Sequence, residues 1–192
     1  MIAVLLIDLQ NAFFEDPALR GCKQSLTTAC NRIIAAAKET GTNVLLVKTE
    51  HEEDKSTWTL NMLEDNQGFI FRGTAQAEFI SELTTQGLPQ MVKTRDSAFL
   101  GTDLMLRLRK WGVDTIVLAG VSTHNCIAQS AADAFGHNLR VIYAAEATAS
   151  ENPEAAAAVQ DILCREYRQQ ILSIAEIRDH LMTPLKSQEA LS

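Results

Sequence analysis

The sequence is short of cysteine and proline, with four of each among its 192 residues. The cysteines are scattered without CxxC spacing, which is typical of free thiols in a reducing cytoplasm rather than of a disulfide framework. A disulfide bridge between Cys22 and Cys30 is the alternative, but nothing else in the sequence is typical of a secreted protein. We therefore expect a cytoplasmic protein with unpaired cysteines.

Long hydrophobic runs and clusters of basic residues are also missing. The first apolar run ends at Ile7, before Asp8, and has no basic leader, so we expect neither a signal peptide nor a transmembrane span. The formal net charge of −7 argues against nucleic acid or an anionic membrane as a partner. The hydrophobic content of 46% is enough for one full core.

Short apolar runs alternate with segments of helical periodicity along the whole chain. This alternation predicts an α/β fold with three layers (α/β/α), in which a six-stranded, mostly parallel, Rossmann-like sheet has helices on both faces. Strands are expected at 2–7, 43–47, 90–92, 115–119, 139–143 and 170–172, and helices at 26–37, 79–83 and 103–111, after Cys126, after Asn152 and after Ser173. We expect a single domain over 1–183 and a frayed tail over 184–192.

The one long irregular stretch is 49–73, which is rich in apolar residues. Such a segment is typical of a pocket wall or a subunit contact. We therefore place Trp58, within this stretch, among the residues expected to line a substrate pocket.

Three chemically active residues follow predicted strands directly. Asp8 follows the first strand, Lys93 the third, and Cys126 begins the helix after the fourth. If these strands are parallel neighbours, their carboxyl ends meet at one crevice, where open α/β sheets bind ligands. A thiol at a helix start is expected to have a lowered pKa and to be a thiolate at neutral pH. Carboxylate base, cation and thiol together predict a nucleophilic hydrolase, with Arg95 as a rival cation.

Simpler interpretations of the same residues exist. Most free cysteines act only as small buried hydrophobic residues, and this is the alternative for Cys126. Asp8 in an ion pair that supports the turn would satisfy its burial without any chemistry.

Three motifs carry a resemblance to a known family: LIDLQNAFF at 6–14, VKTRDSAFLGTDL at 92–104, and GVSTHNC at 120–126. In this order they resemble the isochorismatase-like cysteine hydrolases, which include nicotinamidases, N-carbamoylsarcosine amidases and ureidoacrylate hydrolases. The resemblance implies that Asp8, Lys93 and Cys126 form a catalytic triad. It also implies a cis peptide between Val121 and Ser122 that aims the N–H groups of Ser122 and Cys126 at an oxyanion.

The resemblance extends to the pocket and to the assembly. It implies that Phe13 lines the substrate pocket, where an ordinary core phenylalanine is the alternative, and that the protein is a homo-oligomer. His124 stands two residues before the nucleophile, where relatives often carry an acid, and is expected either to contact substrate or to be exposed.

The metal ligands of nicotinamidases are not matched. Those relatives carry an Asp and a His two residues apart with a further His downstream, whereas this sequence reads TEHEED at 49–54 and has no histidine between His51 and His124. We therefore predict no metal and no other cofactor, with nicotinamide disfavoured as substrate and with His51 and Glu53 at the surface.

The presence of Cys126 favours attack on a C–N bond. We predict a cysteine-dependent hydrolase that cleaves an amide, ureido or carbamoyl group of a small molecule through a thioester. Alternatives are an isochorismatase-type vinyl-ether hydrolase with Cys126 as a bystander, and a binding or scaffold protein that keeps the fold. A phosphoryl-transfer enzyme with Asp8 as nucleophile is disfavoured. Such enzymes carry a second aspartate two residues further on, where this sequence has Gln10, and the sequence has no glycine-rich phosphate loop.

Overall fold

The computed structural model describes residues 1–182, and the predicted tail at 184–192 lies outside the described residues. Six strands form one sheet in the order β3-β2-β1-β4-β5-β6, and every pairing is parallel. The strands are β1 (Ile2–Ile7), β2 (Asn43–Thr49), β3 (Gln90–Lys93), β4 (Thr115–Gly120), β5 (Arg140–Thr148) and β6 (Gln170–Leu172). The predicted three-layer fold is confirmed.

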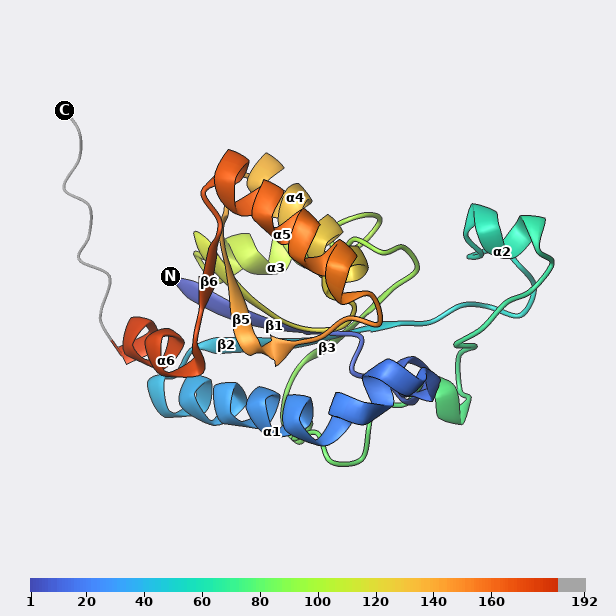
Figure 1. Ribbon diagram of the computed structural model, residues 1–192, viewed down its shortest axis with the longest axis horizontal. Coiled ribbons are helices and arrows are strands. Elements are labelled where there is room, and N and C mark those ends of the chain that lie inside the picture. Colours follow the sequence, from blue (N-terminus) through green and yellow to red (C-terminus); the bar gives the residue numbers. More distant parts are fainter. Residues whose placement is uncertain (183–192) are drawn as a thin grey trace.

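Helices cover both faces of the sheet (Figure 1). One face carries α1 (Pro17–Thr40) and α6 (Ile174–Met182), and the other carries α3 (Leu104–Lys110), α4 (Ala128–Gly136) and α5 (Pro153–Tyr167). Strand β1 contributes to both cores: Val4 and Leu6 pack on the side of α1, while Leu5 packs on the side of α3 and α4. Burial on both faces explains why the strands are continuous apolar runs. Within residues 1–182 no helix combines the length and apolarity that crossing a membrane would require.

Local signals in the sequence set the ends of several helices. Asp16 caps α1 by accepting hydrogen bonds from two N–H groups of the first turn, and Gly41 ends it with a φ of 68°. Asn152 caps α5 by accepting one such bond, from the Ala155 N–H. Ser173 and Glu176 form a reciprocal capping box at the start of α6, as their spacing predicts.

The helix predicted at 79–83 is wrong. Phe79 instead forms an antiparallel bridge with Gln10, and the Ile80 N–H donates to the carbonyl of Leu9. These backbone bonds to the segment after β1 override the helical spacing of the apolar residues, and the nearby helical turn is a short 3-10 turn, Ala75–Ala77. Helix α3 begins one residue later than predicted, although the Thr102 hydroxyl does accept from the Leu104 N–H.

Candidate active site

The site lies where β1 to β4 end. Strand β2 separates β1 from β3, so the three strands of the predicted site are not all direct neighbours. The last residue of β2, Thr49, pairs with Lys93 in register and stands between Lys93 and Asp8. Asp8 follows β1 in a left-handed conformation, with a φ of 58°, which turns the chain out of the strand.

An ammonium, a carboxylate and a thiol meet in this position. The Nζ of Lys93 lies 2.8 Å from Oδ2 of Asp8, 2.7 Å from Oγ1 of Thr49 and 3.4 Å from Sγ of Cys126. The Thr49 hydroxyl donates to Oδ1 of Asp8 at 2.9 Å. All four side chains are buried, with Asp8 0%, Lys93 1% and Cys126 4% exposed. The structure thus brings together the acid, cation and thiol that the sequence singled out.

Thr49 and Gln10 are site residues that the sequence analysis missed. The Gln10 side chain accepts from the Thr49 N–H and donates to the Thr49 carbonyl, both at 2.8 Å, and is itself fully buried. This amide therefore fixes the backbone that carries the Thr49 hydroxyl. A polar residue that ends a strand, as Thr49 does, was the only signal in the sequence.

Oδ2 of Asp8 keeps acceptor capacity. It forms the ion pair with Lys93 but, within the described part of the chain, accepts no hydrogen bond of good geometry. A buried carboxylate oxygen in that state is suited to accept a proton.

The predicted lowering of the Cys126 pKa is wrong. Burial raises the pKa of the thiol well above its usual value, and the negative charge of Asp8 raises it further, while Lys93 acts in the opposite direction. Burial alone would lower the pKa of Lys93, but Asp8 and Cys126 outweigh it and raise that pKa. The resting cluster is therefore a carboxylate, an ammonium and a neutral thiol, with no net charge.

The chain reaches Cys126 through a tight turn. Gly120 has a φ of 117°, and a Cβ there would lie 1.9 Å from the carbonyl oxygen of Ile7, so β4 can approach β1 only with glycine at this point. The Val121–Ser122 peptide bond is cis, and residues 123–127 form a π-helical turn before α4. Among the described residues, none accepts a hydrogen bond from the Ser122 N–H.

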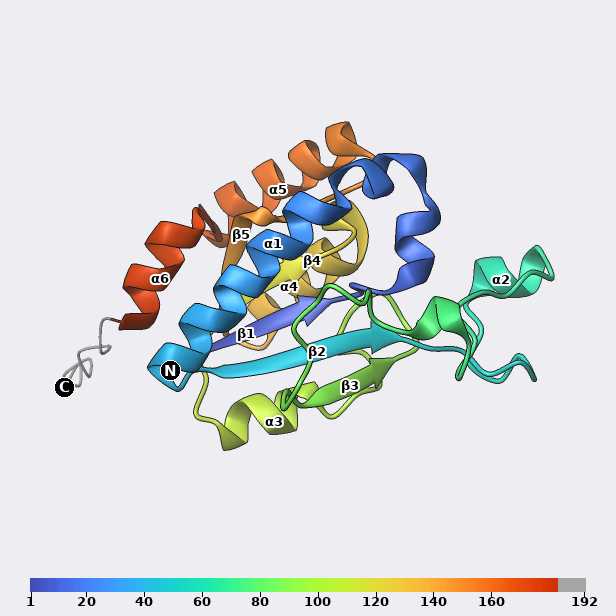
Figure 2. The ribbon, with the colours of Figure 1, turned by 90° about the horizontal axis from the view of Figure 1, so that it is seen from below.

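A cavity of about 850 Å³ opens onto the thiol. Phe13 lies in its wall, as expected from the resemblance, and Cys126 and Ser122 line it as well. The predicted role of the 49–73 segment as a pocket wall is confirmed, since this segment supplies nine lining residues: Thr49, His51, Thr59, Leu60, Asn61, Met62, Asp65, Gln67 and Phe69. The segment includes helix α2 (Leu60–Glu64), which extends beyond the carboxyl ends of the strands (Figure 2).

Two predicted pocket residues do not line this cavity. Trp58 lies behind the wall, where its ring packs on Phe71 and its Nε1 donates to the carbonyl of Glu52 at 2.8 Å. His124 turns toward α5, with Nδ1 2.8 Å from the Ser150 hydroxyl. Periodicity could not separate a wall residue from one packed behind it.

His51 is buried rather than exposed, which corrects its predicted surface position, whereas Glu53 is exposed as expected. Burial lowers the pKa of His51, so the ring is neutral at pH 7, and its Nδ1 lies 3.0 Å from the Thr57 carbonyl. In residues 1–182, no cluster of three or more histidine, cysteine or acidic side chains has an arrangement that could hold a metal ion. The donor set does not fit the divalent metal of nicotinamidases.

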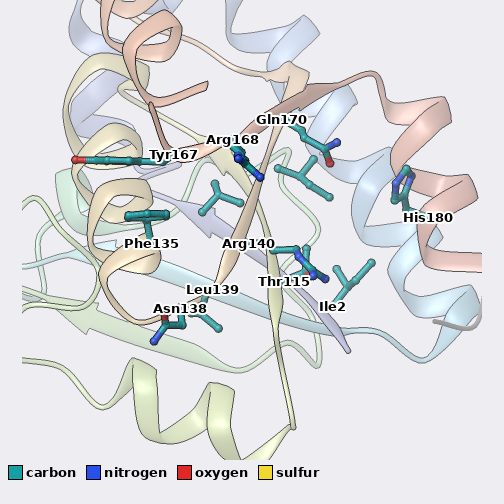
Figure 3. A pocket seen from close by; sticks show the side chains of 12 residues that line it. Ile2, Thr115, Phe135, Asn138, Leu139, Arg140, Tyr167, Arg168, Gln170 and His180 are labelled. Carbon is teal, nitrogen blue, oxygen red and sulfur yellow. The ribbon is translucent and has the colours of Figure 1, made fainter. Parts of the chain in front are cut away.

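A second cavity, of about 600 Å³, lies at the amino ends of β1, β4, β5 and β6 (Figure 3). Its lining includes Arg140, Arg168 and the stacked rings of Phe135 and Tyr167, but neither a cysteine nor a carboxylate. The chemistry therefore belongs to the cavity at the carboxyl ends.

A parallel sheet whose carboxyl edge brings an acid and an amine to a thiol that faces a cavity has the architecture of a hydrolase. The family model of the isochorismatase domain matches residues 2–165. The chain therefore belongs to the isochorismatase family, and it is a hydrolase.

Individual relatives agree with this assignment. The chain is 35% identical over 163 residues to an Arabidopsis thaliana protein named "Probable inactive nicotinamidase", covering 79% of this chain and 82% of that one. It is 34% identical over 121 residues to maleamate amidohydrolase of Pseudomonas putida, covering 59% and 55%. The crystal structure of an isochorismatase family protein from Desulfovibrio vulgaris superimposes with a TM-score of 0.81 at 28% identity, covering 95% and 98%.

Proposed function

We propose that the protein hydrolyses a C–N bond of a small amide, ureido or carbamoyl compound, with Cys126 as nucleophile. One observation carries the proposal: Lys93 Nζ lies within 3.4 Å of both Asp8 Oδ2 and Cys126 Sγ, and the thiol faces a cavity of small-molecule size. The amidohydrolase relative supports a C–N bond as the target.

In the first step the thiol proton moves to Oδ2 of Asp8 while sulfur attacks the carbonyl carbon. The raised pKa of Cys126 means that deprotonation accompanies attack instead of preceding it. Lys93 remains an ammonium throughout and stabilises the negative charge as it develops on sulfur.

The carbonyl oxygen becomes an oxyanion, for which we infer the N–H groups of Ser122 and Cys126 as donors. The Ser122 N–H lies beside the cavity and has no acceptor among residues 1–182, which supports this role. Asp8 then returns its proton to the leaving nitrogen, the C–N bond breaks, and a thioester with Cys126 remains. Asp8 next accepts a proton from water as the water oxygen attacks the thioester; the C–S bond then breaks, the acid is released, and Asp8 returns the proton to the sulfur of Cys126.

The test is release of ammonia or amine from a panel of small amides, ureido acids and carbamoyl compounds. Cys126→Ala should lower turnover by at least about 10³-fold without unfolding the protein, because the nucleophile is lost. Cys164→Ala is the matched control, since this half-buried thiol lies on α5, outside the cavity lining, and its loss should leave turnover unchanged. Normal turnover by Cys126→Ala would contradict the proposal. Activity that is lost in Asp8→Asn but kept in Cys126→Ala would favour vinyl-ether hydrolysis.

We further infer that the protein works in a reducing compartment such as the cytoplasm and as a homo-oligomer. All four cysteines are free thiols, which supports the compartment. Light scattering of the purified protein tests the oligomer, and a mass equal to one 21.1 kDa chain would contradict it.

A further inference from the structure

A second carboxylate stands beside the nucleophile. Oδ1 of Asp96 lies 3.8 Å from Sγ of Cys126, and its Oδ2 accepts a hydrogen bond from Nε2 of Gln129 at 3.1 Å. The same Nε2 donates to Oδ1 of Asn125 at 2.7 Å, so the amide is held in place and orients the Asp96 carboxylate. Asp96 lines the cavity and is partly exposed there, whereas Asp8 is fully buried on its ion pair.

Asp96 has no role in the proposed reaction, and its negative charge acts against the nucleophile. A carboxylate so near the sulfur opposes ionisation of the Cys126 thiol. Among residues 1–182 no cation forms an ion pair with Asp96, so the charge is not there to balance another one. A carboxylate that opposes ionisation of the nucleophile and has no ion-pair partner among residues 1–182 is best explained by what it does for the bound molecule.

The rest of the cavity has the same character. Its lining contains four carboxylates, at Asp16, Asp65, Asp96 and Glu151, against a single guanidinium, at Arg95. Nη1 of Arg95 already donates to the carbonyls of Thr57 and Thr94.

His51 adds a neutral acceptor to the lining. Because a carbonyl cannot donate, the Nδ1 of His51 must carry the proton shared with Thr57, which leaves Nε2 as a bare acceptor. The cavity is therefore rich in hydrogen-bond acceptors and in negative charge, with Asp96 beside the reacting sulfur.

We propose that Asp96 determines specificity by accepting an N–H of the group next to the scissile carbonyl. The preferred substrates are then primary amides or ureido compounds that are neutral or cationic near that carbonyl. Compounds with a carboxylate close to the scissile bond are disfavoured, because two negative charges would lie within a few ångströms of each other. This inference rests on the proposed function.

The experiment compares two alkylating reagents that differ in charge at the position in question. Iodoacetamide and iodoacetate both form an S–C bond to Cys126 and release iodide, while the thiol proton passes to Asp8. The second-order rate constants at pH 7 are followed by mass spectrometry of the Cys126 peptide and divided by those of free glutathione. In the native protein we expect this normalised ratio to favour iodoacetamide by at least about tenfold.

Asp96→Asn keeps the size and the acceptor for Gln129 but removes the charge, so the normalised ratio should fall about tenfold toward one. Asp96→Glu, which keeps the charge, should restore most of the preference. Asp65→Asn removes an equal charge from the same cavity at a residue that does not contact the sulfur, and should change the ratio far less. The ratio reports specificity separately from the general reactivity of the thiol, which both reagents share.

An unchanged ratio in a folded Asp96→Asn protein would overturn the inference and leave the proposed function intact. So would a wild-type panel in which succinamate, an anionic amide, is hydrolysed as fast as neutral or cationic amides. A folded protein that releases neither ammonia nor amine from any compound of the panel would overturn the proposed function together with this inference.

Discussion

Replacing Asp8 by asparagine should make Cys126 more reactive while abolishing turnover. In the native cluster the Lys93 ammonium is balanced by Asp8, 2.8 Å away, and the thiol is neutral. Asparagine leaves the buried ammonium without a counter-ion, and an uncompensated buried charge is strongly destabilising. Ionisation of Cys126, 3.4 Å from the same nitrogen, restores neutrality, so the thiolate should replace the carboxylate as the partner of Lys93.

The size of the effect follows from the two distances to Lys93 Nζ. Asp8 Oδ2 and Cys126 Sγ cannot be farther apart than the sum of those distances, about 6 Å. At an effective dielectric constant of about 20, two unit charges at that separation repel by ~3 kcal/mol. Removal of this repulsion should raise the rate of alkylation by iodoacetamide at pH 7 by more than about tenfold. Turnover should fall by about 10²- to 10⁴-fold, because the general base is lost.

The assay measures modification of the Cys126 peptide by mass spectrometry and amide hydrolysis on the same preparation, with circular dichroism to confirm folding. Thermal melts of Asp8→Asn, Cys126→Ala and the double variant provide the control. Only the double variant removes both groups that can supply a negative charge to Lys93. It should therefore lose more stability than the two single variants lose together. Alkylation of folded Asp8→Asn that is unchanged or slower would refute the argument that the Asp8 charge keeps the thiol protonated.

Two further changes test other parts of the site and core. Thr49→Val should lower turnover by about 10- to 100-fold and stability by about 1–3 kcal/mol, because Asp8 loses a donor and Lys93 an acceptor. Thr49→Ser keeps the hydroxyl and should recover most of the turnover and the stability. A fully active Thr49→Val protein would rule out this role. Burial raises the pKa of Cys30 to about 12 from the usual 9.0, so between these values only the unfolded thiol ionises and stability falls as pH rises, by up to about 1.4 kcal/mol per pH unit. Cys30→Ala should flatten this alkaline slope in urea unfolding at pH 8 and 10.5, and an equal slope in both proteins would contradict it.

The candidate residues that the sequence identified share one property. Each of them interrupts an apolar pattern where a buried strand ends or has just ended: Asp8, Lys93 and Cys126. A charge or a thiol is unusual in that position and therefore indicates a site. Thr49 occupies the same kind of position but is an ordinary residue for a strand. Its importance depends on β2 lying between β1 and β3, which is a property of the sheet order and cannot be read from local sequence.

Other expectations failed because local rules were outweighed by tertiary surroundings. The helix-start argument for a lowered Cys126 pKa assumed a partly exposed thiol, but the side chain is 4% exposed and lies near Asp8. The apolar residues around Phe79 have helical spacing, yet their backbone pairs with the chain after β1. The capping box of Ser173 and Glu176 forms as its spacing predicts, because it depends only on the first turn of its own helix.

The order in which the chain supplies the site has a consequence for refolding kinetics. Asp8, Thr49, Lys93 and Cys126 come from the ends of four successive strands, so the first and last of them are separated by more than a hundred residues. Contacts of such long sequence separation form late, after the cost of closing the intervening loops has been met. No partly assembled intermediate can contain a working set of these groups. In a refolding experiment the return of turnover should therefore lag behind the return of helical signal.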